Sequence, residues 1–474
     1  MSDADPNIRP DEILAVRRGP GANCSSIGSA LDILYLSATF AGAVLAGVAA
    51  ALGKHRHPPG PQNPPAIDKN KHEYKNPEPR NANKNASSLR ARAEPFGAWA
   101  RIDDSTLVAV ARPAAIRLGL VPPPNSSQFE PNSTVSPPLE AHLAVTSRCG
   151  AGCKGCYLDA RPDGDQPPLE QIETRLRAIA AAGVFTVALG GGEPLSRPDL
   201  GEIGAAARAL GLVPVVTTSG IGMTPERAQS LRSFAQVNVS YDGDADGYEI
   251  VRGWDGARVA ERAMSLLADA GVPFGVNVVL TRQSFPRLAR TLERAEQLGA
   301  REAQLLRYKP AGRARGADYL AARLSNDQIQ NLLPTLQTIA SERSLGLRID
   351  CAMVPLLSAS PLDPALLTRF GVLGCEAGRH LSAVRIDGLI APCSFASPSE
   401  SPLETAFSDT PSAGWQTDPV LAAYRALPDI EPCRSCSLRD VCRGGCRIVA
   451  ERAGAPDPEC PRVVAHRKEH YDPR

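Results

Sequence analysis

The chain has 474 residues, of which 43% are apolar, enough to form the cores of two or three folded units joined by linkers. Its formal net charge is only +1, which argues against a nucleic-acid-binding protein with a strong basic field. Twelve cysteines are the outstanding feature, and eleven of them follow residue 148. Clustered cysteines in a large chain without a cleavable signal peptide indicate metal ligation rather than disulfides, so we expect a reducing, cytoplasmic location.

Residues 1–53 resemble no enzyme domain. Residues 33–52 form a run of about twenty residues without a charge, long enough to span a bilayer as a helix, although its many small residues make insertion only marginally favourable. Cys24 lies in a short reactive stretch after a leader-like head, and this segment is similar to a precursor peptide of the ribosomally made, post-translationally modified class. Two interpretations stay open: a built-in peptide substrate, or an extension that is disordered or contacts a membrane through residues 33–52, with Cys24 an ordinary thiol.

Residues 54–94 are crowded with proline, asparagine, lysine and histidine and contain few apolar residues. Such a stretch cannot bury enough surface to offset its chain entropy, so we predict a disordered linker there. The next segment, residues 95–138, has a pattern typical of a small hairpin and one helix over 96–120, followed by a second polar linker.

From His142 onward, strand-like and helix-like segments alternate at a spacing of roughly thirty residues. The predicted strands are His142–Ser147, Phe185–Leu189, Val213–Thr218, Gln236–Tyr241, Phe274–Leu280 and Glu302–Tyr308. Six βα units predict an α/β fold over residues 139–350, in which a parallel sheet curves into a partial, TIM-like (β/α)₆ barrel. Functional groups then belong at the carboxyl ends of the strands.

The first chemical motif follows the first predicted strand and has the spacing CxxxCxxC, formed by Cys149, Cys153 and Cys156. Three thiolates on one short loop can ligate three irons of a [4Fe–4S] cube and leave the fourth iron open. That iron can bind the amino and carboxylate groups of S-adenosylmethionine (SAM) and pass it an electron, which cleaves SAM to a 5′-deoxyadenosyl radical. The alternative is a zinc site, which normally shows four ligands.

Together with Gly190-Gly191-Gly192-Glu193-Pro194 after the second predicted strand, this motif resembles the radical SAM superfamily. The resemblance implies that the segment Gly191 to Pro194 contacts the SAM amino group, and it makes Ser219 and Arg252 further SAM-site candidates. The chain departs from the family at Gly155, where an aromatic residue often precedes the third cysteine. This departure does not affect cluster ligation, but the aromatic side chain that usually contacts the SAM base is missing at this position.

The second chemical motif is a series of seven cysteines in the C-terminal region, residues 351–474. It resembles the signature of SPASM domains, which hold two auxiliary [4Fe–4S] clusters. The resemblance implies two ligand sets. The first is Cys375, Cys393 and Cys446, and the second is Cys433, Cys436, Cys442 and Cys460. Because the first set is one ligand short, we expect Cys351 to complete it; the alternatives are an open iron and a buried, apolar role for Cys351.

The resemblance implies a peptide maturase with three [4Fe–4S] clusters and SAM, which abstracts hydrogen from a peptide residue to form a crosslink or an oxidised side chain. It also implies a flavodoxin- or ferredoxin-type reductant, and no nucleic-acid partner is expected. Two alternatives stay open: formylglycine formation as in anaerobic sulfatase maturases, and an iron–sulfur electron-transfer protein without catalysis. The sequence assigns no catalytic side chain.

Overall fold

The computed structural model describes residues 13–18, 90–104, 106–122, 135–369, 372–407, 413–450 and 454–471. Most of the predicted linker, the apolar run 33–52 and Cys24 lie outside these residues. Within them, no helix is both long and apolar enough to cross a membrane. The chain divides into two compact units, one containing residues 90–122 and the other containing residues 135–471.

The smaller unit is an antiparallel sheet with one helix. It consists of β2 (Arg90–Glu94), β3 (Gly97–Asp103), β4 (Thr106–Ala111) and α3 (Arg112–Arg117). Small apolar residues of β3, β4 and α3, such as Ala98, Val108 and Ala114, form its core. The strand β1 (Ile13–Arg18) adds to this sheet, whose order is β1-β4-β3-β2. The expected hairpin and helix are therefore present.

β2 differs from the sequence prediction, because Arg90–Glu94 falls within the stretch 54–94 that was expected to be a disordered linker. In the segment RARAE the more buried positions are the charged residues Arg90, Arg92 and Glu94, and the two alanines are exposed. Such a pattern carries almost no hydrophobic signal of a strand. The strand forms because its backbone pairs with β3, from Arg90↔Arg101 to Glu94↔Gly97. The composition of the segment alone does not predict it.

The larger unit is built on a nine-stranded sheet with the order β11-β10-β9-β8-β7-β6-β5-β12-β13. Its strands are β5 (Glu140–Thr146), β6 (Thr186–Gly191), β7 (Val213–Thr218), β8 (Gln236–Ser240), β9 (Phe274–Leu280), β10 (Glu302–Arg307), β11 (Gly346–Ile349), β12 (Leu381–Val384) and β13 (Ile390–Ala391). All neighbouring pairs from β11 to β12 are parallel, and only β13 runs antiparallel to β12. The six predicted strands are all present, and the partial-barrel prediction is confirmed.

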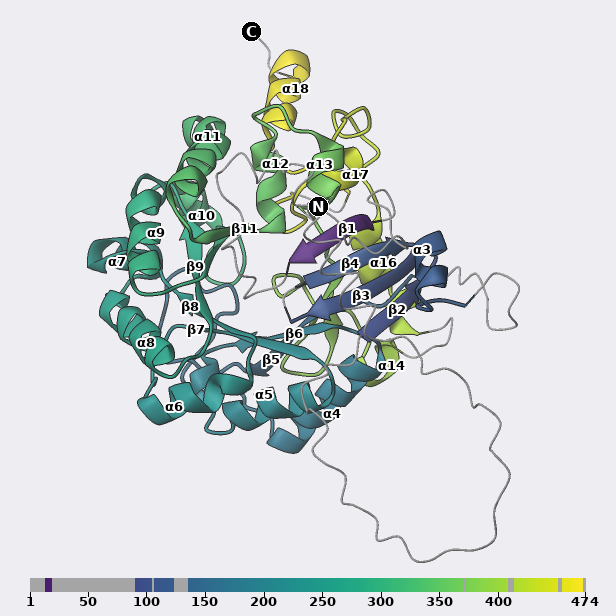
Figure 1. Cartoon of the computed structure of the whole chain (residues 1–474). Helices are drawn as coiled ribbons and strands as arrows, with labels where there is room; N and C mark the ends of the chain where they lie inside the picture. Colours follow the sequence, from purple (N-terminus) through teal and green to yellow (C-terminus); the bar gives the residue numbers. More distant parts are fainter. Residues whose placement is uncertain are drawn as a thin grey trace, which may run out of the picture. The chain divides into compact units, whose positions relative to one another are not determined.

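Helices connect the strands and follow the outer side of the curved sheet (Figure 1). They are α4 (Leu169–Ala181), α5 (Leu200–Ala209), α6 (Pro225–Ser230), α7 (Ala245–Arg252), α8 (Ala257–Asp269), α9 (Leu288–Gln297), α10 (Gly316–Ala322) and α11 (Asn326–Glu342). In α4, Ile172, Leu176 and Ile179 are fully buried, as their helical spacing predicts. One large apolar core joins these helices to the sheet.

The cysteine-rich region is loop-rich, as expected, but it also extends the barrel sheet. β12 pairs with β5 in parallel, with Leu381 opposite Glu140. Its helices are short apart from the last one: α12 (Val354–Leu357), α13 (Pro364–Arg369), α14 (Leu403–Ala406), α15 (Gly414–Thr417), α16 (Pro419–Arg425), α17 (Arg439–Cys442) and α18 (Pro461–Tyr471). Several of these elements pack on the large barrel core through residues such as Leu357, Leu403 and Trp415. A smaller cluster that includes Val354, Leu438 and Val441 joins α12 to α17.

Candidate cofactor and cluster site

The first cysteine loop begins directly after β5, at the carboxyl end of the sheet. Burial raises the pKa of the Cys149 thiol, and the nearby charges of Glu193, Cys153 and Cys156 raise it further. The three thiols therefore share one small volume beside Glu193. Their loop is fastened at its start, where Cys149 N donates to the carbonyl of Arg161 at 2.8 Å.

Two residues that the sequence prediction did not include contact this loop. Trp254 Nε1 lies 3.3 Å from Cys153 Sγ and donates to it. Arg313 Nε donates to the carbonyl oxygen of Cys153 at 2.9 Å. Trp254 lies two residues after the SAM-site candidate Arg252, and Arg313 lies in a Pro-Ala-Gly-Arg stretch, residues 310–313.

The glycine-rich segment ends β6 against the end of β5. Gly191 has φ +121°, and a Cβ atom there would lie 2.0 Å from the carbonyl oxygen of Thr146. Gly192 N donates to the same oxygen at 2.7 Å, and Glu193 N donates to the carbonyl of Arg148 at 2.8 Å. Only glycine permits this backbone conformation and close approach. The segment therefore places Glu193 next to the cysteine loop.

Glu193 is buried and accepts four hydrogen bonds. Oε1 accepts from Thr218 Oγ1 at 2.6 Å and from Leu195 N at 3.0 Å. Oε2 accepts from Ser219 N at 2.7 Å and from Ser219 Oγ at 2.5 Å. Burial raises the pKa of Glu193, while these bonds oppose the shift. All four acceptor positions of the carboxylate are thus used to hold the ends of β6 and β7 together. Pro194 begins the short turn that follows.

Arg252 at the end of α7 lies beside the same loop. Its backbone carbonyl accepts from Lys154 N at 3.0 Å, while its side chain Nε pairs with Asp242 Oδ2 at 2.6 Å. Asp242 is fully buried and also accepts from Val279 N at 2.7 Å. Burial alone would lower the pKa of Arg252, but Asp242 together with Tyr248 and Cys153 outweighs this and the pKa is raised. The guanidinium is therefore a fixed positive charge next to the cysteine loop.

At Gly155, where the family often has an aromatic residue, the ring of Tyr308 packs against the cysteine loop. A Cβ atom added at Gly155 would lie 2.9 Å from both Cε2 and Oη of the Tyr308 ring. Tyr308 directly follows β10, and its ring stacks on Tyr319 with centroids 6.1 Å apart. Gly155 thus leaves the space that this ring occupies, and an aromatic side chain is present at the loop even though the local motif lacks one.

Four further cysteines form a second group, which we call set I: Cys351, Cys375, Cys393 and Cys446. The charge of Cys375 contributes to the pKa of each of the other three thiols, and Cys446 also acts on Cys351. Burial raises the pKa of Cys393 to about 11 and that of Cys446 to about 12. Cys351, which follows β11, therefore lies near Cys375, Cys393 and Cys446. These are the three cysteines for which a fourth ligand was expected.

The remaining four cysteines form set II and line a single pocket: Cys433, Cys436, Cys442 and Cys460. Apolar residues such as Leu438 and Val463 complete the pocket wall. Two polar side chains approach its sulfurs. Arg462 donates to Cys436 Sγ at 3.1 Å, and Ser358 Oγ lies 3.5 Å from Cys460 Sγ. Burial raises the pKa of Cys433 to about 11.

The donor chemistry of these groups fits iron–sulfur clusters. All eleven described cysteines are free thiols, and most are in surroundings where an unpartnered thiolate is unfavourable. A metal bound to such thiols deprotonates them and supplies the missing positive charge. Within the described part of the chain, no three His, Cys, Asp or Glu side chains are close enough to hold a single metal ion. In a cube each thiolate binds a different iron, so the sulfur atoms stand apart.

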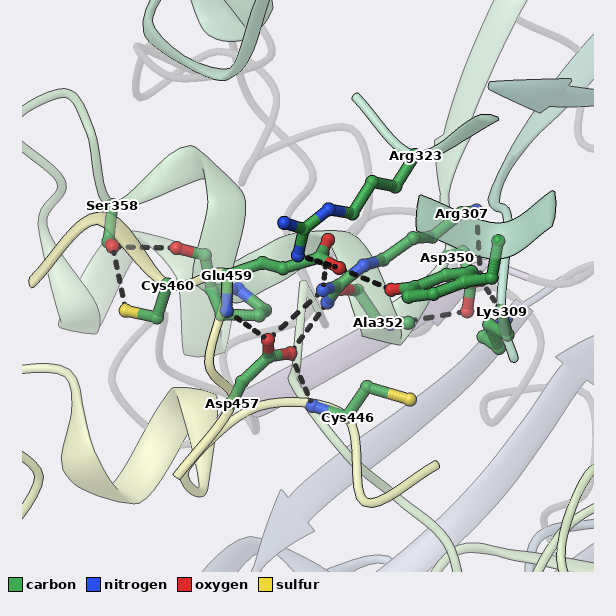
Figure 2. A network of polar contacts seen from close by, with 12 residues as sticks. Arg307, Lys309, Arg323, Asp350, Ala352, Ser358, Cys446, Asp457, Glu459 and Cys460 are labelled. Atoms are coloured by element: carbon green, nitrogen blue, oxygen red, sulfur yellow. Dashed lines mark hydrogen bonds and ion pairs between the residues drawn. The ribbon is translucent and has the colours of Figure 1, made fainter. Parts of the chain in front are cut away.

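A buried network of charges connects the barrel to the segment between set I and set II (Figure 2). Arg307 of β10 pairs with Asp457 through two bonds of 2.6 and 3.0 Å, and with Glu459 at 2.8 Å. Asp457 Oδ2 also accepts from Cys446 N at 3.1 Å, and Glu459 lies directly before Cys460. One arginine of the barrel therefore fixes backbone next to a cysteine of each set. The sequence prediction did not include this network.

Comparison with known proteins agrees with these observations. The profile of the Radical SAM superfamily matches residues 143–295. A PqqA peptide cyclase from Ruegeria pomeroyi is 31% identical over 365 residues, which cover 73% of this chain and 93% of that protein. The mycofactocin maturase MftC of Mycobacterium tuberculosis is 28% identical, over 67% of this chain and 81% of its own length.

Among solved structures, Streptococcus suis SuiB bound to S-adenosylmethionine has a TM-score of 0.61 and 17% identity, and the match covers 79% of this chain and 99% of SuiB. The same protein is also known in complex with the precursor peptide SuiA. At this level of identity the likeness shows a shared fold, and it extends over both the barrel and the cysteine-rich region.

Proposed function

Because the chain belongs to the radical SAM superfamily, we propose that it is a maturase that modifies a ribosomally made peptide. Peptides are the substrates in the names of its relatives, the PqqA peptide cyclase among them, and SuiB is known with its precursor peptide. The observation that carries the proposal is the presence of three separate thiol groups, of which the first has only three members and lies beside Glu193. An electron-transfer protein would have no need of the Glu193 and Arg252 arrangement at that place.

Cys149, Cys153 and Cys156 would hold one [4Fe–4S] cluster, and sets I and II would hold two more, with Cys351 as the fourth ligand of set I. When bound, the first cluster supplies the electron for reductive cleavage of SAM, which provides the oxidising power for hydrogen abstraction. The chain's own groups position the reactants. Glu193 holds the ends of β6 and β7, with Ser219 as its donor, and Arg252 presents a fixed charge. Gly191 and Gly192 allow the close backbone approach.

The proposed location is the cytoplasm, where reduced flavodoxin or ferredoxin would supply the electrons and where thiols stay reduced. The proposed peptide substrate is the chain's own N-terminal segment. β1 supports this proposal, because residues 13–18 add a strand to the small sheet and lie directly before the stretch that contains Cys24. A tethered substrate has a local concentration on the order of millimolar, so it needs little affinity of its own.

The function is tested with anaerobically reconstituted full-length protein. We expect about twelve irons per chain from three [4Fe–4S] clusters. We also expect formation of 5′-deoxyadenosine when SAM and a reductant are added. Replacing the three cysteines Cys149, Cys153 and Cys156 by alanine should remove about four irons and all SAM cleavage. Wild-type protein with only one cluster would contradict the assignment of sets I and II, and absence of 5′-deoxyadenosine would contradict a radical SAM activity.

The substrate is tested by peptide mapping of the same reaction. A crosslink in residues 1–94 lowers the mass of that segment by two hydrogen atoms, whereas formylglycine formation changes a single Cys or Ser residue. Val16→Pro in β1 is the matched variant, because proline removes a backbone donor from the strand and should reduce the modification without affecting SAM cleavage. An unmodified segment after many turnovers of SAM would exclude the built-in substrate and leave only an external peptide.

A further inference from the structure

A buried lysine lies beside set I, the group formed by Cys351, Cys375, Cys393 and Cys446. Lys309 follows β10 by two residues, and only 5% of its side chain is exposed. Its ammonium group pairs with Asp350 and lies over the ring of Phe395, 4.2 Å from the ring centre. Phe395 is two residues after Cys393, and Asp350 directly precedes Cys351, so both contacts are made to residues next to set I cysteines. Figure 2 shows the pair at the barrel end of the charged network.

Both members of this pair carry their charge. Burial works against the ammonium of Lys309, but Asp350 together with the nearby Cys446 and Cys351 outweighs it, and the pKa of the lysine is raised. Burial likewise works against the carboxylate of Asp350, but Lys309 and two backbone N–H groups hold its pKa below the usual value. These backbone donors are Ala352 N at 3.2 Å and Arg307 N at 3.2 Å. The carboxylate is thus fixed by three groups, and it fixes the lysine in turn.

The two charges do not act equally on set I. The ammonium of Lys309 acts on Cys351, Cys393 and Cys446, and among the charges that act on Cys446 it is the strongest. The carboxylate of Asp350 acts most strongly on Cys351, the residue that follows it. The geometry agrees with this: the ammonium lies between Asp350, next to Cys351, and the ring of Phe395, two residues after Cys393.

We propose that the Lys309 ammonium raises the reduction potential of the cluster held by set I, and that the Asp350 carboxylate, the opposite charge of the pair, partly offsets this effect. A cluster bound by four thiolates is an anion, and reduction adds one more negative charge. A fixed ammonium in surroundings of low dielectric stabilises the more negative, reduced form, so it raises the potential and makes the cluster a better electron acceptor. This inference rests on the proposed function, because it requires a cluster at set I. The role of Lys309 is that of a positioned charge and not of a ligand.

The test is a redox titration of full-length protein in which the first cluster has been removed by replacing Cys149, Cys153 and Cys156 with alanine. The auxiliary clusters are then followed by their EPR signals. Lys309→Met should lower the potential of one auxiliary cluster, changing the ratio of reduced to oxidised cluster about tenfold at the wild-type midpoint, or about 59 mV for one electron. Asp350→Asn should raise it, and Lys309→Arg should leave it nearly unchanged. Lys468→Met, at an exposed lysine of α18, is the control and should have no effect.

Opposite signs for Lys309→Met and Asp350→Asn distinguish an electrostatic role from a structural one. Loss of packing would weaken the cluster in both variants and could not shift its potential in opposite directions. If both variants shift the potential in the same direction, or Asp350→Asn leaves it unchanged, the inference is wrong. Iron content separates this failure from a failure of the proposed function. About eight irons with unshifted potentials reject only the role of Lys309, whereas four or fewer reject the proposed pair of auxiliary clusters.

Discussion

Asp457 offers a sharp test of how the barrel holds the cluster-binding region. Its carboxylate is fully buried and accepts two bonds from Arg307, one from Cys446 N and one from Glu459 N at 3.0 Å. Replacing Asp457 by alanine removes one partner of a buried ion pair, which typically costs 3–5 kcal/mol, or roughly 3 kcal/mol here because Glu459 still faces Arg307.

This loss of free energy converts into a measurable change in thermal stability. The larger unit contains roughly 340 residues, so its unfolding entropy is about 0.7 kcal/mol per degree, and a loss of 3 kcal/mol lowers Tm by about 4 °C. We also expect iron loss. Without Asp457 the backbone at Cys446 loses its acceptor, so set I should hold its cluster less firmly and iron should fall from about twelve toward about eight per chain.

The matched control is Asp429→Ala, which removes the exposed ion pair between Asp429 and Arg434. Exposed pairs contribute at most about 1 kcal/mol, so this variant should keep both its Tm and its iron. Scanning calorimetry and iron analysis of both variants, prepared and heated identically, give the comparison. If Asp457→Ala is as stable as Asp429→Ala and keeps all its iron, the buried network does not hold the cluster region in place.

Three further outcomes are expected. Cys351→Ala should destabilise one auxiliary cluster or change its EPR signal; an unchanged spectrum would indicate a non-cysteine ligand or an open iron. Glu193→Gln should reduce SAM binding about tenfold in equilibrium dialysis, because its NH₂ cannot accept from a backbone N–H and so leaves Ser219 N or Leu195 N unpaired, at a cost of 1–3 kcal/mol. Gly155→Ala should slow 5′-deoxyadenosine formation through its contact with the Tyr308 ring, and a second change of Tyr308 to alanine should restore it; no recovery would show that the contact is unimportant.

The barrel was predictable because its signals are local. Each βα unit carries its own hydrophobic period and turn residues, so the predicted strands agree with β5 to β10 to within two residues at either end. The cysteine motifs were equally visible, because metal ligands recur at fixed short spacing. By contrast, the strand Leu381–Val384 pairs with β5, which lies about 240 residues earlier in the sequence. Neither the length nor the composition of the strand predicts that pairing.

The charged networks could not be predicted for the same reason. Arg307 and Asp457 are separated by 150 positions, and each is an ordinary charged residue in its local sequence. Lys309 and Tyr308 lie next to a recognisable turn, yet only the fold shows that one faces set I and the other faces Gly155. Cys351 is an intermediate case. Counting ligands suggested it, and the structure supplied its neighbours.

Residues 307–313, from the last residue of β10 onward, contact residues in or beside all three groups of cysteines. Arg307 holds the chain beside Cys446 and Cys460, Lys309 faces set I, and Arg313 donates to the loop of the first cysteines. Three side chains within this short stretch thus reach three separate places. A displacement of this segment would therefore disturb all three groups together. Lys309→Met is expected to shift the potential of one auxiliary cluster only. A change confined to one cysteine group in this way indicates that the side chain acts by its charge and not by holding the segment in place.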